Sequence, residues 1–153
     1  MSKTLGDLSH AVLRYLFGNR CSQAAGLALA TVSKVKLQIV NAISFSIAGV
    51  LYLKAATNEI VVAAAVQAAN STCYYVLCLN SAGTLSAVKG TDGGDIPAVT
   101  DETLCPIGVL KIVNAQAASA TVTLGTTDLT TAGITTSFKD LAALPLTAAD
   151  IGL

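Results

Sequence analysis

The sequence predicts a mainly β protein, a compact antiparallel β-sandwich or barrel-like domain with a short N-terminal helix and an extended arm. Three observations favour this class: apolar and polar residues alternate from Lys34 onward, turn sequences separate the apolar runs, and only 12% of residues are charged while 53% are hydrophobic. With 153 residues the chain can form one such domain. We divide it into a helix and arm at 1–33, a β domain at 34–141 and a tail at 142–153.

The N-terminal element is predicted to be an amphipathic helix over about Leu5–Phe17. Thr4 followed by Asp7 resembles a capping box, and the helical run ends at Gly18-Asn19. The apolar residues that share one face at helical spacing are Leu5, Leu8, Val12, Tyr15 and Leu16. Residues 20–33 are small, polar and aperiodic, which favours a linker or an extended arm that lies on a neighbouring subunit.

From Lys34 the pattern changes to the two-residue period of a strand. Val35, Leu37 and Ile39 point one way, and the polar residues between them point the other way. Further strands are predicted at 43–47, 50–55, 59–64, 72–79, 84–89, 107–113 and 121–124. Short strands separated by turn sequences argue for a sandwich or a barrel and against alternating βαβ units.

Three segments lack the period of a strand. Residues 90–103 carry three glycines, one proline and four acidic residues, which predicts a surface loop. Residues 125–136 are aperiodic as well. The tail LAALPLTAADIGL either packs as a short helix or docks on a partner, because its low charge disfavours free solvation.

The charge balance bears on the partners that we expect. Nine Lys and Arg residues balance nine Asp and Glu residues, so no global field attracts nucleic acid or anionic lipid. A mean hydropathy of +0.66 with so few charges favours coverage of apolar surface by another subunit. The uncharged stretches 37–53 and 60–88 are interrupted by polar residues such as Gln38 and Gln67, and no secretory signal is visible, so we expect neither a membrane span nor secretion.

The residue types needed for catalysis do not form a recognisable set. The single histidine, His10, lies on the predicted helix beside apolar neighbours, and no G-x-S-x-G, P-loop or G-x-G-x-x-G motif is present. Asp92, Asp95, Asp101 and Glu102 form the one acidic cluster, which lacks the alternating ligand pattern of a calcium loop. We therefore expect no enzyme, no cofactor and no metal, and keep a small hydrolase that acts through Asp95 or Glu102 as a minor alternative.

The four cysteines are Cys21, Cys73, Cys78 and Cys105. Cys73 and Cys78 lie five residues apart on one predicted strand, so their side chains point to opposite faces and cannot bond to each other. No pair has the spacing of zinc ligands. The default role of each is that of a small buried hydrophobe. The even count also permits disulfides, for example Cys78 to Cys105 or Cys21 to a neighbouring chain, once the protein reaches an oxidising medium.

The order of motifs in the second half of the chain resembles a known module. A strand, an N-S-A-G turn and a second strand in CYYVLCLNSAGTLSAVKG precede CPIGVLKIV and then TVTLGTTDLTTAGITTSFKDL, and FSIAGVLYLKAATNEI lies upstream. This order is similar to a module of tailed-bacteriophage virion structural proteins, found in small head decoration (cement) proteins and in pieces of head or tail fibres. The resemblance covers about Asn41–Leu141 and does not include the predicted helix and arm.

The resemblance implies a non-enzymatic structural protein that binds the outside of the capsid lattice and stabilises it by bridging neighbouring capsomers. The implied partners are the major capsid protein and other copies of the chain in a homotrimer, on a virion assembled from protein made in the bacterial cytoplasm. The apolar face of the predicted helix lies outside the resemblance, and we expect it to contact the capsid or a neighbouring subunit. The main alternative is a head or tail fibre, or a host-adhesion module.

Overall fold

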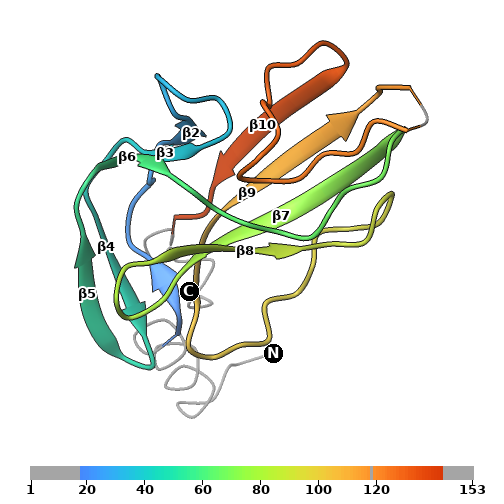
Figure 1. The fold of residues 1–153 in the computed structure, drawn as a ribbon. Helices are drawn as coiled ribbons and strands as arrows, with labels where there is room; N and C mark the ends of the chain where they lie inside the picture. Colours follow the sequence, from blue (N-terminus) through green and yellow to red (C-terminus); the bar gives the residue numbers. More distant parts are fainter. Residues whose placement is uncertain (1–17, 118, 143–153) are drawn as a thin grey trace, which may run out of the picture.

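The computed structural model describes residues 18–117 and 119–142, and these residues form strands joined by turns and loops, without a helix (Figure 1). The chain is mainly β, and its three sheets are all antiparallel, an arrangement consistent with the predicted β-sandwich. The predicted N-terminal helix lies outside the described residues. The same is true of its apolar face, made by Leu5, Leu8, Val12, Tyr15 and Leu16.

The larger layer is a four-stranded sheet in the order β10-β9-β7-β8. Its strands are β7 (Ser71–Leu79), β8 (Leu85–Lys89), β9 (Cys105–Asn114) and β10 (Ile134–Asp140). Burial alternates along β9 from Gly108 to Asn114, so this strand turns one row of side chains toward the core, whereas the five residues Tyr75–Leu79 of β7 are all buried. A bulge between Leu77 and Cys78 shifts the register of β7 on β9.

Two three-stranded sheets form the rest of the fold and lie beside the four-stranded sheet (Figure 1). The first has the order β1-β4-β5, with β1 (Arg20–Cys21), β4 (Ile43–Ile47) and β5 (Val50–Lys54). The second has the order β2-β3-β6, with β2 (Leu27–Leu29), β3 (Leu37–Ile39) and β6 (Thr57–Ile60). Inward side chains from all three sheets meet in a single core, whose largest fully buried members include Phe45, Leu37, Tyr75, Leu77 and Ile112.

The structure differs from the sequence prediction in three segments. Residues 20–33 were expected to form a linker or an arm lying on a neighbour, but β1 and β2 pair with β4 and β3 of the same chain, and Cys21, Ala25 and Leu27 are buried. The region predicted to be aperiodic at 125–136 runs into strand β10. The strand predicted at 121–124 is reduced to one bridge between Val122 and Gln67.

The two ends of the described chain lie side by side. A shallow depression of about 210 Å³ is lined by Asn19, Arg20, Cys21, Pro106, Leu141 and Ala142. The side-chain amide of Asn19 holds the first end in place, because it donates to the carbonyls of Glu102 (2.6 Å) and Leu104 (2.9 Å) and accepts from the N–H of Ala48 (2.8 Å). The first and last described residues therefore lie in one region of the domain.

A carboxylate at the end of β10 joins that strand to β2. The Asp140 side chain accepts hydrogen bonds from the N–H groups of Gly26 and Leu27, each at 3.1 Å. Beside this contact, Gly108 faces the core opposite Leu77, and a Cβ built there would lie only 2.1 Å from Leu27 Cδ1. The absence of a side chain at position 108 thus leaves the space that Leu27 fills, and Asp140 holds the backbone of β2 there.

Replacing Asp140 with alanine is expected to destabilise the domain by about 2 kcal/mol, because two backbone donors lose a charged acceptor. The free energy of unfolding, measured by urea denaturation, tests this expectation. Asp95→Ala is the matched control, since Asp95 is an exposed carboxylate on the 90–104 loop. Equal stability of the two variants would contradict a structural role for the Asp140 contact.

Candidate functional site

The acidic residues predicted as a candidate cluster do not converge. Asp92 forms an ion pair with Lys89 at 2.6 Å, whereas Asp101 caps its own turn by accepting from the N–H (2.8 Å) and the hydroxyl (2.6 Å) of Thr103. Asp95 and Glu102 are exposed. Among residues 18–117 and 119–142, no group of three or more His, Cys, Asp or Glu side chains is placed to hold a metal ion.

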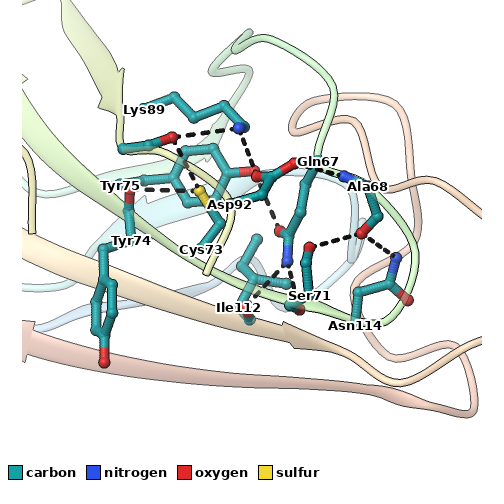
Figure 2. A network of polar contacts seen from close by, with 11 residues as sticks. Gln67, Ala68, Ser71, Cys73, Tyr74, Tyr75, Lys89, Asp92, Ile112 and Asn114 are labelled. Carbon is teal, nitrogen blue, oxygen red and sulfur yellow. Dashed lines mark hydrogen bonds and ion pairs between the residues drawn. The ribbon is translucent and has the colours of Figure 1, made fainter. Parts of the chain in front are cut away.

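The most connected polar cluster surrounds the buried Gln67 (Figure 2). Its side-chain amide donates to the carbonyls of Ser71 (3.0 Å) and Ile112 (3.1 Å), and its side-chain oxygen accepts from the Tyr75 hydroxyl at 3.2 Å. The backbone of Gln67 also exchanges two hydrogen bonds with Val122. Gln67 thus fastens the 61–70 segment to the four-stranded sheet through three separate contacts.

Asp92 extends this cluster to the loop that follows β8. One carboxylate oxygen accepts from Lys89 Nζ at 2.6 Å, and the other accepts from the N–H of Ala68 at 2.8 Å (Figure 2). Burial by itself raises the pKa of Asp92, but the hydrogen bonds from Lys89 and Ala68 outweigh it, so that the net pKa lies below its usual range. The charged form of Asp92 is therefore the one that holds the 90–95 loop against residue 68.

Nothing in this cluster is poised for catalysis. Burial raises the pKa of the Tyr75 hydroxyl and of the neighbouring Cys73 thiol, so both groups remain protonated near neutral pH. Cys73 Sγ donates to the Gly90 carbonyl at 3.4 Å. Every buried side-chain nitrogen and oxygen of the described residues has a hydrogen-bond partner. Such complete pairing is typical of a structural network.

All four cysteines are buried free thiols. Cys73 lies in the core, as strand alternation predicts, whereas Cys78 lies on the opposite face of β7 and is covered as well. Burial raises the pKa of Cys78 to about 11 and that of Cys105 to about 12, and Cys21 and Cys78 add to the rise at Cys105 because they lie close to it. The structure therefore brings together three of the cysteines proposed for disulfides, as thiols without ready nucleophilic character.

A solvent-exposed surface of leucines and serines lies on the outer side of the β1-β4-β5 sheet. Antiparallel register places Leu51 opposite Ser46 and Leu53 opposite Ser44, so these side chains share one face. Leu51 is 69% exposed and Leu53 is 81% exposed. Ser22, at the end of β1, joins them through a 2.7 Å hydrogen bond from its hydroxyl to the Ser44 carbonyl. We call the surface made by Ser22, Ser44, Ser46, Leu51 and Leu53 the β5 face.

The β5 face is supported from the core side by an aromatic pair, and its outer side has two depressions. Tyr52, between the two leucines, points inward and stacks on Phe45, with ring centroids 5.5 Å apart. A depression of about 420 Å³ adjoins Leu53, and another of about 190 Å³ adjoins Leu51. β5 is also an edge strand of its sheet. Exposed leucines on a firmly held edge strand are features of a protein-contact surface.

Sequence reasoning placed β5 correctly but did not single out its outer face. The run Val50-Leu51-Tyr52-Leu53 is apolar at consecutive positions, so both faces of this strand are apolar. Such a run marks a strand that is covered on both sides, and among residues 18–117 and 119–142 only the inner cover is present. The contact residues predicted on the N-terminal helix, like His10, lie outside the described residues.

Comparisons with protein families, with curated proteins and with solved structures find no match for this chain. In the part of the chain that the structure describes, no helix is long and apolar enough to span a membrane. The function is therefore argued from the β5 face, the internal networks and the sequence motifs.

The four thiols are expected to resist modification until the protein unfolds. At a given pH well below both values, a thiol with a pKa of about 11 has a thiolate fraction roughly 100-fold below that of one at 9.0, and burial also blocks access. Titration with Ellman's reagent should therefore give slow reaction in buffer and four rapid equivalents in denaturant. A thiol that reacts as fast in buffer as in denaturant, or a dimer band on a non-reducing gel, would contradict this expectation.

Asp92→Asn is expected to lower the free energy of unfolding near neutral pH by about 1 kcal/mol, because the ion pair is partly exposed. Since the pKa of Asp92 is lower in the folded state, its contribution is present above the unfolded pKa and is lost as the pH falls through the folded one. The wild type should thus lose more stability than the variant between about pH 6 and pH 3. Asp95→Asn provides the control, and parallel pH profiles for wild type and Asp92→Asn would refute the assignment.

Proposed function

We propose that this chain is a non-enzymatic structural protein of a tailed-phage virion that binds the outside of the capsid lattice and bridges neighbouring capsomers. The observation that carries the proposal is the β5 face, where Leu51 and Leu53 stand exposed on a firmly packed edge strand. The motif order from Asn41 to Leu141 supports the phage assignment. The proposed partners are the major capsid protein and other copies of the chain in a homotrimer.

The chemistry of the β5 face suits many weak contacts to a protein lattice. Complete burial of one leucine side chain contributes about 1.5–3 kcal/mol, so two leucines supply a modest affinity for each copy. A lattice presents the same site many times, and a subunit that contacts two capsomers at once gains avidity without new contacts. The chain would stabilise the shell mechanically, by linking capsomers that otherwise separate.

The internal polar groups agree with a role that involves no catalysis. The Gln67, Tyr75 and Asp92 side chains hydrogen-bond to groups of their own chain, and the thiols are buried. The chain also has no net charge, and the β5 face is made of leucines and serines. Binding through this face should therefore depend little on ionic strength, unlike binding steered by charge.

The double variant Leu51→Gln/Leu53→Gln is expected to bind expanded capsids of the encoding phage at least about tenfold more weakly than the wild type, because loss of a few kcal/mol of apolar burial exceeds the 1.4 kcal/mol that corresponds to a factor of ten. Co-sedimentation at two salt concentrations measures this affinity. Thermal unfolding should change little, since both side chains are exposed.

Val32→Gln is the matched control, because Val32 is 87% exposed but follows β2, in a different sheet. Equal binding by the wild type and the double variant would show that another surface makes the contact. A wild-type protein that ignores capsids but coats host cells would replace the proposal with the host-adhesion function, and measurable glycan cleavage lost in Asp95 or Glu102 variants would replace it with the hydrolase.

A further inference from the structure

The outer face of the four-stranded sheet carries a second surface feature, a hollow of about 380 Å³. The residues that matter for its chemistry are Tyr74, Ile96, Val109, Lys111, Lys139 and Leu141. Register explains how they meet, because Tyr74 of β7 lies opposite Lys111 of β9, and Val109 of β9 lies opposite Lys139 of β10. The hollow thus has an apolar floor and two lysines from adjacent strands.

The two lysines give this hollow an unbalanced positive charge. Neither Lys111 nor Lys139 forms an ion pair with a carboxylate of residues 18–117 or 119–142, where the ion pairs are Lys36 with Glu59 and Lys89 with Asp92. Lys111 Nζ lies 5.8 Å from the centre of the Tyr74 ring, which keeps its charge beside the apolar floor.

The nearest acidic residue in sequence does not balance this charge. Asp140 follows Lys139, but its carboxylate accepts from the N–H groups of Gly26 and Leu27. The hollow therefore suits an apolar peptide segment that carries a carboxylate.

The chain itself supplies a segment of this kind at the edge of the hollow. Leu141 lines the hollow, and the described chain ends one residue later, at Ala142. Residues 143–153 contain no Lys, Arg or His and one acidic residue, Asp150. Their large apolar residues are Leu144, Leu146, Ile151 and Leu153.

We propose that residues 143–153 dock in this hollow of the same chain, with the Asp150 carboxylate beside Lys111 and Lys139. The ten residues from Leu141 to Asp150 are joined by nine Cα-to-Cα steps that span up to about 30 Å when extended, so the segment is long enough to turn back over the sheet. Because it is tethered at the rim, its effective concentration is on the order of millimolar, and weak contacts are enough to hold it. This proposal is independent of the capsid function, since it concerns a different sheet and an occupant within the chain.

Carbodiimide coupling of carboxylates to amines in the full-length protein tests the docking. Asp150 is expected to form cross-links to Lys111 or Lys139 several-fold more often than to Lys54, a lysine of β5 in another sheet. An equal mixture of ¹⁴N- and ¹⁵N-labelled protein distinguishes cross-links within one chain from those between chains. The 2.6 Å pair of Lys89 and Asp92 serves as the internal positive control.

Asp150→Asn should remove these cross-links and leave the Lys89–Asp92 cross-link unchanged. Any cross-link that Asp140 makes at the end of β10 should also remain, so the variant distinguishes the carboxylate of the docked segment from that of Asp140. Docking in the same chain is overturned if Asp150 couples equally to Lys54, if it couples only between chains, or if it does not couple while the Lys89 control does. Lys111→Gln/Lys139→Gln should also increase hydrogen exchange at residues 143–153 several-fold, and unchanged exchange would overturn the proposal as well.

Discussion

The contact between the Asp140 carboxylate and the backbone of β2 ties together two sheets that share one core. The strands of each sheet form their backbone hydrogen bonds with other strands of the same sheet. No strand pairing therefore connects the β2-β3-β6 sheet to the four-stranded sheet. Beside the shared core, a carboxylate that binds two adjacent N–H groups adds a polar connection at the end of β10. Gly108 makes it sterically possible, because the space above its Cα receives the Leu27 side chain.

The buried polar side chains of the domain stabilise its fold through internal hydrogen bonds. Gln67 and Asp92 bind backbone groups, Tyr75 donates its hydroxyl to the Gln67 side chain, and the raised pKa values of the thiols keep the thiols neutral. An internal network of this kind fixes one arrangement of loops around the sheet, because each unpaired buried group would cost free energy. What the molecule offers to partners is therefore concentrated on its surface, in the leucines of the β5 face.

The alternation of apolar and polar residues in the sequence predicted the strands that have one buried face. It did not predict strands whose pairing depends on residues distant in the sequence. Ile43–Ile47 is a strand at the predicted bounds because its buried and exposed side chains alternate cleanly. Strands β1 and β2 are too short to show a period, and their partners, β4 for β1 and both β3 and Asp140 for β2, are recognisable only in the folded chain. The β5 face escaped prediction for another reason, since a run that is apolar on both sides does not reveal which side remains uncovered. The hollow above β9 depends on cross-strand register, which the sequence pattern does not determine.

The closeness of the two ends of the described chain has a topological consequence. Asn19 and Ala142 line the same depression, so a short linker could join the ends without disturbing either layer. Such a circular permutant would keep every strand pair, and new ends could be opened in the 90–104 loop, beyond β8. Peptides fused directly at Asn19 and at Ala142 would leave the domain next to each other, which makes this fold suited to displaying two peptides side by side.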